Sequence, residues 1–254
     1  MKLNWVEYGL EAFGLGLFML SASLFGVLLF HPASPVVAAI AEPLPRGALM
    51  GLAMGLTAMV NTYSPWGRRS GAHLNPAVTL TFHSLGKVSR VDLVGYLAGQ
   101  FLGGAVGIQV AILVLGPWLG HPAVNYVATV PGPAGVAVAF LAEALITFVL
   151  MTVVLAFVAH PRLAPYTGAA AAGLVALYIT FEAPFSGMSM NPARTLASAV
   201  PAMSWSPLWI YFTAPPLGML AAAVARRRHA GRHCAKLHHD HRYRCIFCER
   251  SHSS

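Results

Sequence analysis

Residues 70–80 read SGAHLNPAVTL, and residues 186–196 read SGMSMNPARTL. Both stretches contain Asn-Pro-Ala with Ser-Gly at the same offset upstream, and they lie about 115 residues apart. Asn is a favoured N-cap residue, and Pro suits the first helical turn because no amide hydrogen bond is lost there. The two copies therefore predict helix starts at Asn75 and Asn191.

The apolar segments that follow, 76–85 and 192–201, are about half as long as a membrane span. Ten helical residues rise about 15 Å, so two such segments together cover a hydrocarbon core of about 30 Å. We therefore expect two half-helices that enter from opposite faces and meet tip to tip. The alternative is that both segments are surface loops.

The composition is that of a membrane protein. Hydrophobic residues make up 57% of the chain, charged residues only 9%, and the mean hydropathy is +0.64. A soluble domain would carry about a quarter charged residues. Apolar runs of spanning length occur at 9–30, 134–159 and 205–225, and weaker ones at 47–63, 91–115 and 166–183. The sequence therefore predicts an all-α membrane protein with six tilted transmembrane helices.

The motifs belong to a larger duplication. Glu11 and Glu143 each lie near the start of an apolar helix, and each is followed by a second span, an Asn-Pro-Ala segment and a third span. Three crossings per half is an odd number, so the halves must be inverted, and inverted repeats place their site near the midplane. We expect repeats at 1–130 and 131–225, followed by a basic tail at 226–254.

Positive charge is concentrated on one side of this six-span arrangement. Basic residues lie in the tail and in the segments that share its side, whereas the alternate connections 31–46 and 116–133 contain only Arg46. By the positive-inside rule both termini are cytoplasmic, in the cell (inner) membrane. Nucleic-acid binding, the other explanation for a pI near 9.8, is not favoured because the basic residues flank spans.

Glycines predict close helix packing. Gly47, Gly51 and Gly55 recur every four residues, and so does the series Gly95, Gly99, Gly103 and Gly107. Each series lines one helix face and would let a neighbouring backbone approach.

Paired helix N-termini at the membrane centre would each present about half a positive charge, which repels cations including hydronium. The two Asn amides would hold a passing water by its oxygen and so interrupt a proton-conducting chain of waters; aquaporin-type pores are the known example of this selectivity. Arg194 lies in the first turn of the second half-helix, where the dipole disfavours a cation, so a role in the outer mouth is predicted. The alternative is a structural Arg bonded to loop carbonyls.

These residues resemble the major intrinsic proteins, the aquaporins and glycerol facilitators, over about 5–225. The likeness also includes "YLAGQFLGG" at 96–104 and "LWIYFTAPPLG" at 208–218. It implies a homotetramer in the lipid bilayer with one pore per subunit, and a channel rather than an enzyme. It implies that Glu11 and Glu143 hold the half-helix loops. It assigns the central constriction to Asn75, Pro76, Ala77, Asn191, Pro192 and Ala193.

The resemblance places Arg194, Met188, Ile179 and Met54 in the outer selectivity filter. Water-selective members typically carry His at the position of Ile179, and this filter is apolar and free of aromatic residues. Two other positions favour the water channels. Thr195 lies where glycerol facilitators usually carry Asp, and Ala199 lies where they usually carry a basic residue. Water, glycerol-like polyols, ammonia and hydrogen peroxide all remain candidate solutes.

Two other classes compete with a passive channel. A secondary transporter also uses inverted repeats and broken helices but normally needs an ion or proton site. An intramembrane enzyme is not favoured, because no HExxH or GxSxG pattern occurs. His73 is interpreted as a loop-supporting residue behind the pore.

The tail contains all three cysteines of the chain and several histidines. Cys234, His238, Cys245 and Cys248 are candidate zinc ligands, with His239, His241 and His252 as further candidates. The upstream spacing is irregular, so the primary expectation is a disordered basic tail on anionic lipid, with no metal and no cofactor.

Overall fold

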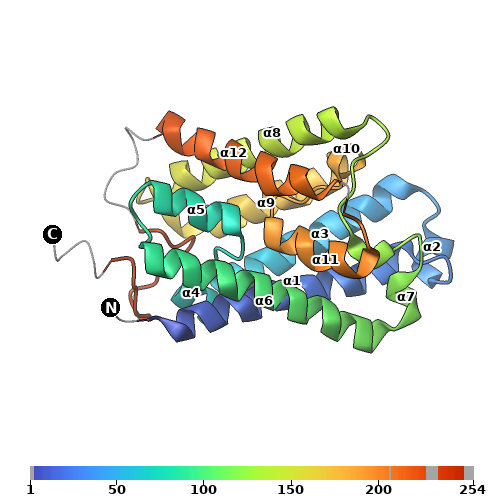
Figure 1. Ribbon diagram of the computed structural model, residues 1–254, viewed down its shortest axis with the longest axis horizontal. Helices are drawn as coiled ribbons and strands as arrows, with labels where there is room; N and C mark the ends of the chain where they lie inside the picture. The colour runs from blue at the N-terminus through green and yellow to red at the C-terminus, as the bar shows by residue number, and fades with distance from the viewer. Residues whose placement is uncertain (1–2, 206, 227–233, 249–254) are drawn as a thin grey trace.

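The computed structural model describes residues 3–205, 207–226 and 234–248, and within them the regular structure is helical (Figure 1). The long helices are α1 (Trp5–Phe30), α3 (Pro43–Tyr63), α6 (Arg90–Leu115), α8 (Val136–Val158), α9 (Thr167–Phe181) and α12 (Leu208–Arg226). The short ones are α2 (Pro35–Ala39), α4 (Pro65–Ser70), α5 (Pro76–Ser84), α7 (Pro117–Gly120), α10 (Ala183–Ser186) and α11 (Pro192–Ala202). Two 3-10 turns, η1 (Asn125–Val127) and η2 (Ala164–Tyr166), lie in connections.

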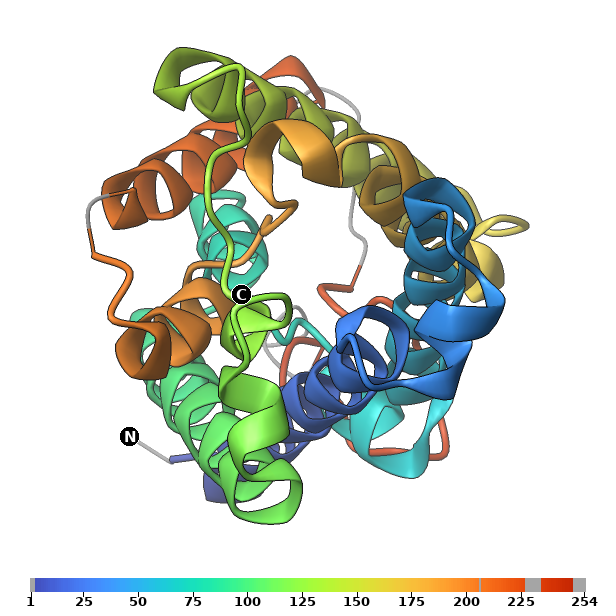
Figure 2. The ribbon, with the colours of Figure 1, turned by 90° about the vertical axis from the view of Figure 1, so that its right-hand side faces the viewer.

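Helix pairing has the symmetry that a duplicated chain would produce. α1 packs mainly on α6 and α8 mainly on α12, while α3 and α9 pack on each other. The short helices follow the same pattern, since α11 packs on α6 and α5 on α12. Figure 2, viewed from the end opposite the termini, shows the long helices around a central axis. The contact pattern thus relates α1, α3, α5 and α6 to α8, α9, α11 and α12.

Within the part of the chain that the structure describes, five helical segments are long and apolar enough to cross a membrane: Trp5–Phe30, Arg90–Leu115, Val136–Val158, Ala164–Phe181 and Leu208–Arg226. α3 has 21 residues and completes the six predicted spans, although its mean hydropathy is lower. Large apolar side chains such as Leu113 and Val224 are 84% and 75% exposed. Side chains of this kind on the outside of a bundle suit contact with lipid rather than water.

The half-helices α5 and α11 have 9 and 11 residues, within one residue of the predicted bounds at each end. Figure 1 shows α5 in the half of the molecule that holds the termini and α11 in the other half. The alternative of two surface loops is therefore wrong. Most residues of both helices are buried, including Ala77, Thr79, Ala193 and Thr195.

Most glycines of the two predicted series, which lie on α3 and α6, allow a neighbouring helix to approach closely. A Cβ on Gly103 would lie 2.1 Å from the Ala12 carbonyl oxygen of α1, and a Cβ on Gly51 would lie 2.4 Å from the Ala176 oxygen of α9. Gly47 is an exception, because nothing lies within 4 Å of its Cβ position. Gly95 faces a side chain, the ring of Tyr8, rather than a backbone.

The tail is a correction to the sequence-based expectation. Residues 234–248 fold back onto the end of the molecule that holds the N-terminus, and Ala235, Ile246 and Phe247 belong to a hydrophobic cluster with Phe82 and Tyr96. The described part of the tail is therefore packed protein rather than a disordered chain on lipid.

Replacing Gly103 by Val is expected to destabilise the α1–α6 contact by on the order of 3 kcal/mol, because overpacking forces the two backbones apart. The measurement is thermal unfolding in detergent, followed by tryptophan fluorescence. Gly173→Val is the matched control, since Gly173 is an exposed helical glycine with nothing within 4 Å. Equal losses in the two variants would contradict the packing role of Gly103.

Candidate functional site: a pore built from two broken helices

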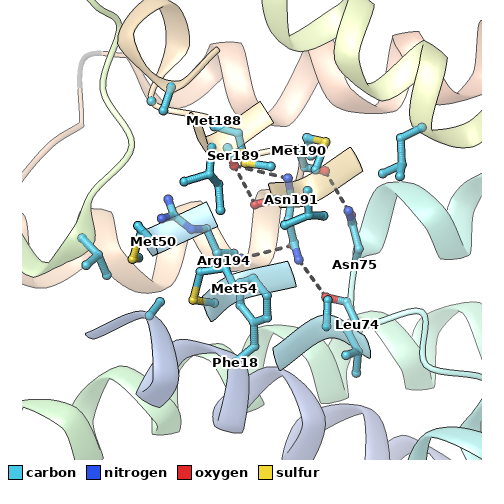
Figure 3. Close-up of a pocket in the computed structure, with 18 of the residues that line it drawn as sticks. Phe18, Met50, Met54, Leu74, Asn75, Met188, Ser189, Met190, Asn191 and Arg194 are labelled. Atoms are coloured by element: carbon cyan, nitrogen blue, oxygen red, sulfur yellow. Dashed lines mark hydrogen bonds between the residues drawn. The ribbon is translucent and has the colours of Figure 1, made fainter. Parts of the chain in front are cut away.

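The N-termini of the half-helices are joined by crossed hydrogen bonds between their loops (Figure 3). Asn75 Nδ2 donates to the Met190 carbonyl at 2.7 Å, and Asn191 Nδ2 donates to the Leu74 carbonyl at 2.7 Å. Each side-chain oxygen caps its own helix: Asn75 Oδ1 accepts from Ala77 N–H, and Asn191 Oδ1 accepts from Ala193 N–H. The oxygen and the nitrogen of each Asn side chain are therefore both fixed by hydrogen bonds.

This geometry refines the predicted role of the two amides. Each carboxamide nitrogen carries two protons, and one of them is used to hold the opposite loop. The second proton of each is the donor that can meet a solute, since both Asn75 and Asn191 line the central cavity.

The loops that lead to the two Asn residues share an unusual backbone. Ala72 and Leu74 have φ of 54° and 50°, and Met188 and Met190 have φ of 48° and 55°. Non-glycine residues in the left-handed region each cost on the order of 1–3 kcal/mol and persist only where the surroundings fix them. Alternate left-handed residues prevent helix continuation and leave the loop N–H groups in need of acceptors inside the protein.

Glu11 supplies acceptors for the first loop. Its Oε1 accepts from Ser70 Oγ at 2.8 Å and from His73 N–H at 3.1 Å, and its Oε2 accepts from Leu74 N–H at 2.6 Å. Gln100 Nε2 of α6 donates to the same Oε2 at 2.8 Å. Glu11 is completely buried, so it lies where the resemblance places a loop-holding carboxylate.

Glu143 makes the equivalent contacts with the second loop. Its Oε1 accepts from Ser186 Oγ at 3.0 Å and from Ser189 N–H at 2.5 Å, and its Oε2 accepts from Met190 N–H at 2.8 Å. Glu143 is also completely buried. One carboxylate per half therefore fixes the two residues that precede each Asn.

Sequence reasoning missed a pair of tyrosines that complete these sites. Tyr96 of α6 donates from its hydroxyl to the Ser70 carbonyl at 2.5 Å, and Tyr211 of α12 donates to the Ser186 carbonyl at 2.5 Å. Both follow their Asn-Pro-Ala motif by about 20 residues, so aligning the two halves of the sequence would have paired them.

A cavity of about 600 Å³ runs along the axis between the two ends of the bundle. Its lining includes Phe30 at the end of α1, Leu44 at the start of α3 and Val124 beside η1, and also Thr62 near the end of α3, Gly168 at the start of α9 and Leu237 of the tail. Both Asn residues line it as well, where the two loops are joined by hydrogen bonds.

Arg194 and the three other predicted filter residues, Met188, Ile179 and Met54, all line this cavity. Arg194 as a whole is partly exposed, while its Nη1 is buried and has no hydrogen-bond partner among the described residues. Phe18 also lines the cavity and packs with Met54 and Ile179, so the wall at this level does include an aromatic ring (Figure 3).

His73 is part of the first loop, is buried, and is among the residues that line the cavity. Its Nδ1 is 3.1 Å from Thr79 Oγ1, its Nε2 is 2.7 Å from the Ala235 carbonyl, and its ring stacks on Phe82 and Phe247. The residue predicted to support the loop therefore also contacts the tail.

In the tail, His239 rather than His238 reaches the three thiols, while the His238 ring packs against Tyr63. His252 lies outside the described residues.

A hydrogen bond from Cys234, helped by the Lys236 ammonium, lowers the pKa of Cys245 to about 4 against the opposing effect of burial.

The comparisons with known proteins agree with this architecture. The family model for the major intrinsic proteins matches residues 11–225. The chain therefore belongs to the major intrinsic protein family. It is a multi-pass membrane protein with the aquaporin fold, which confirms the predicted family and fold class.

Aquaporin NIP3-1 of Oryza sativa subsp. japonica is 37% identical over 205 residues, which are 78% of this chain and 63% of that protein. Aquaporin NIP3-1 of Arabidopsis thaliana is 36% identical over 180 residues, covering 68% of this chain and 54% of that protein. The matches thus span less than two thirds of these relatives. The X-ray structure of the aquaglyceroporin from Plasmodium falciparum superposes with a TM-score of 0.70 at 19% identity, covering 88% and 95% of the two chains.

Replacing Glu143 by Ala is expected to destabilise the protein by on the order of 3–5 kcal/mol, because two buried N–H groups of the second loop lose their acceptor. Thermal unfolding in detergent measures the effect. Glu42→Ala, which removes an exposed carboxylate at the start of α3, is the control. A Glu143 variant as stable as the control would contradict the loop-holding role.

Proposed function

We propose that the protein is a passive transmembrane channel for water and small uncharged solutes. The observation that carries this proposal is the crossed Asn75–Met190 and Asn191–Leu74 pair, set midway along a cavity that extends toward both ends of the bundle. A cavity with oriented donors at its centre suits a solute that enters with an oxygen lone pair and leaves unchanged.

Exclusion of cations follows from the charges that face the cavity. Two helix N-termini each contribute about half a positive charge at the centre, and Arg194 adds a full one nearby. A cation that reaches this level loses its hydration shell and meets hydrogen-bond donors and the positive helix N-termini, which repel it. A neutral solute pays a smaller desolvation cost, because the loop carbonyls and the second amide protons can form hydrogen bonds in place of those that it makes to water outside.

The wall favours small neutral solutes beyond water. Ile179 and Met54 offer apolar surface, and the partly exposed Arg194 offers guanidinium donors, which together suit a short polyol. A glycerol-type facilitator is therefore the second candidate, and ammonia or hydrogen peroxide would use the same pore. The printed names of the relatives, aquaporin and aquaglyceroporin, are compatible with both candidates.

A secondary transporter is less favoured by the hydrogen bonding of the intramembrane carboxylates. Glu11 accepts four hydrogen bonds and Glu143 accepts three, so most of the acceptor sites of both carboxylates are already used within the protein. Glu11 and Glu143 therefore hold the loops in place rather than carry a coupling ion or proton.

The orientation and assembly belong to the same proposal. Both termini face the cytoplasm, because Arg68, Arg69 and the tail lie at one end of the bundle. The repeats at 1–130 and 131–225 form one pore, and four chains form a homotetramer in the cell membrane, as the family resemblance implies.

The test is permeability of proteoliposomes by stopped-flow light scattering, with osmotic gradients of an impermeant sugar and of glycerol. Water flux well above that of protein-free liposomes, without saturation and independent of ion or proton gradients, is expected. Uptake that saturates and follows an ion gradient would instead establish a transporter. Water and glycerol fluxes both at background would overturn the channel.

Replacing Arg194 by Val is expected to raise cation and proton leakage by about tenfold or more, because a full charge within several ångströms of the path is removed. Proton flux is measured with a pH-sensitive dye inside the liposomes. Arg46→Val is the control: Arg46 also lies at the end opposite the termini, but its guanidinium is bonded to the Leu29, Ala41 and Glu42 carbonyls. Unchanged leakage in the Arg194 variant would contradict its role as a filter.

A further inference from the structure

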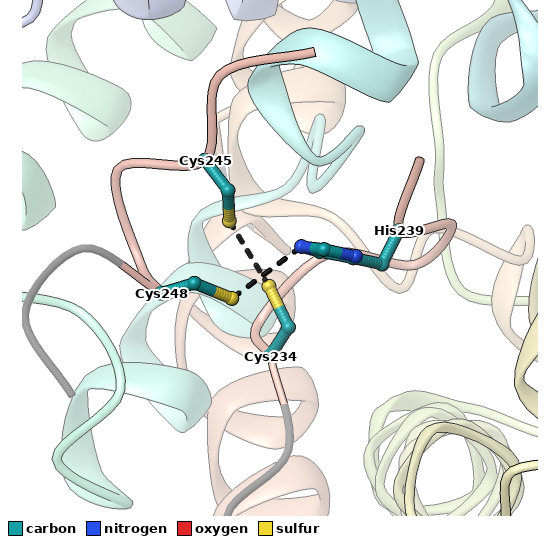
Figure 4. Close-up of side chains that lie close together, drawn as sticks. All are labelled: Cys234, His239, Cys245 and Cys248. Carbon is teal, nitrogen blue, oxygen red and sulfur yellow. Dashed lines mark hydrogen bonds between the residues drawn. The ribbon is translucent and has the colours of Figure 1, made fainter. Parts of the chain in front are cut away.

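Four metal-binding side chains converge in the tail segment, residues 234–248 (Figure 4). The ligand atoms of Cys234, His239, Cys245 and Cys248 all lie within 4.8 Å of one another. Cys234 Sγ is 3.2 Å from Cys245 Sγ, and Cys248 Sγ is 3.4 Å from His239 Nε2. In Figure 4 the four side chains point toward a common centre from separate turns of the chain.

The set of donors and their separations suit a tetrahedral zinc ion. With Zn–S near 2.3 Å and Zn–N near 2.0–2.1 Å, tetrahedral edges are about 3.8 Å between sulfurs and about 3.6 Å between sulfur and nitrogen. The separations in the structure bracket these edges. Cys245 and Cys248 also have the Cys-x-x-Cys spacing of structural zinc sites.

The surroundings of the sulfurs fit bound thiolates. Lys236 is 2% exposed, and its Nζ donates to the Arg68 and Arg244 carbonyls at 2.7 and 2.9 Å. A Zn²⁺ ion with three thiolates and a neutral imidazole has a net charge of −1, which the buried ammonium would balance.

We propose that Cys234, His239, Cys245 and Cys248 bind one Zn²⁺ ion, which fixes the tail segment against the first pore loop. The segment has no helix or strand, and a piece this short cannot build a hydrophobic core of its own. Short segments of this kind usually depend on a metal or disulfide for a defined shape. The proposal replaces the expectation of a metal-free tail.

The segment that the metal would hold is in direct contact with the pore loop. Leu237 N–H donates to the Gly71 carbonyl at 3.1 Å, and the Phe247 ring stacks on His73 with centroids 5.6 Å apart. Arg68 forms an ion pair with Asp240 at 3.2 Å. Leu237 itself lines the cavity, so the proposed metal lies beside the terminal mouth of the pore.

The first experiment measures metal on the full chain, purified in detergent with a thiol reductant and no chelator. About one zinc per chain is expected by mass spectrometry, and Co²⁺ substitution is expected to give the visible bands of a tetrahedral thiolate site. Cys245→Ser and His239→Ala should each weaken Co²⁺ binding at least about 100-fold. His238→Ala is the matched control and should leave it unchanged, because the His238 ring packs on Tyr63.

Several outcomes would overturn the proposal. One is a wild-type protein that takes up no stoichiometric Zn²⁺ or Co²⁺; another is a His238 variant that loses the metal while the His239 variant keeps it. A Cys234–Cys245 disulfide in reductant, detected by alkylation and intact mass, would also exclude the site. Gel filtration of each variant shows that the transmembrane body remains folded.

The second experiment tests whether the metal fixes the segment. Chelation of the wild-type protein is expected to accelerate amide hydrogen exchange at least about tenfold within residues 234–248, including Leu237 N–H, and to leave residues 192–202 unchanged. Unchanged exchange in the tail after complete metal removal would overturn the fixing role. Neither experiment depends on permeation, so both stand apart from the test of the channel.

Discussion

The whole pore depends on how an interrupted backbone is satisfied in the middle of a bilayer. Irregular backbone at this depth is tolerated only where protein or a water-filled cavity satisfies its polar groups, and each unsatisfied group costs several kcal/mol. Glu11 and Glu143 resolve this by accepting from the two N–H groups that precede each Asn, and Ser70 and Ser186 reinforce each carboxylate. Because the carboxylates fix the left-handed residues of both loops, the half-helices can begin at the same level and face each other.

The polar functions of the site are consequences of that arrangement. Once each helix begins at the centre, the first-turn N–H groups are capped by the Asn oxygens, so each amide nitrogen is oriented toward the opposite loop and the cavity. Among the described residues that line the cavity there is no carboxylate, so the donors and the positive helix ends face the path without a counter-charge. The same geometry that stabilises the broken backbone therefore also supports the proposed exclusion of cations.

Sequence predicted the features that follow from local rules and from duplication. The Asn-Pro pairs indicated helix starts, short apolar runs indicated half-helices, and the glycine series indicated close packing except at Gly47. Features that depend on distant side chains were missed. Tyr96 and Tyr211 act through hydroxyls that reach loops more than 20 residues away, and residues 234–248 pack on a loop more than 160 residues earlier. The common spacing from each motif could have paired the two tyrosines, but no periodicity or spacing indicates where residues 234–248 pack.

The two pore loops are alike in backbone but are covered by different segments of the chain. Gly71 and Gly187 occupy equivalent left-handed positions with φ of 108° and 80°. The second loop is covered by the connection between α7 and α8, where Gly132 N–H donates to the Phe185 carbonyl and Val130 packs on Gly187. That connection is tethered at both ends by helices. The first loop is covered by residues 234–248, a segment without helix or strand, and the side-chain cluster around Cys245 offers a constraint on the shape of that segment.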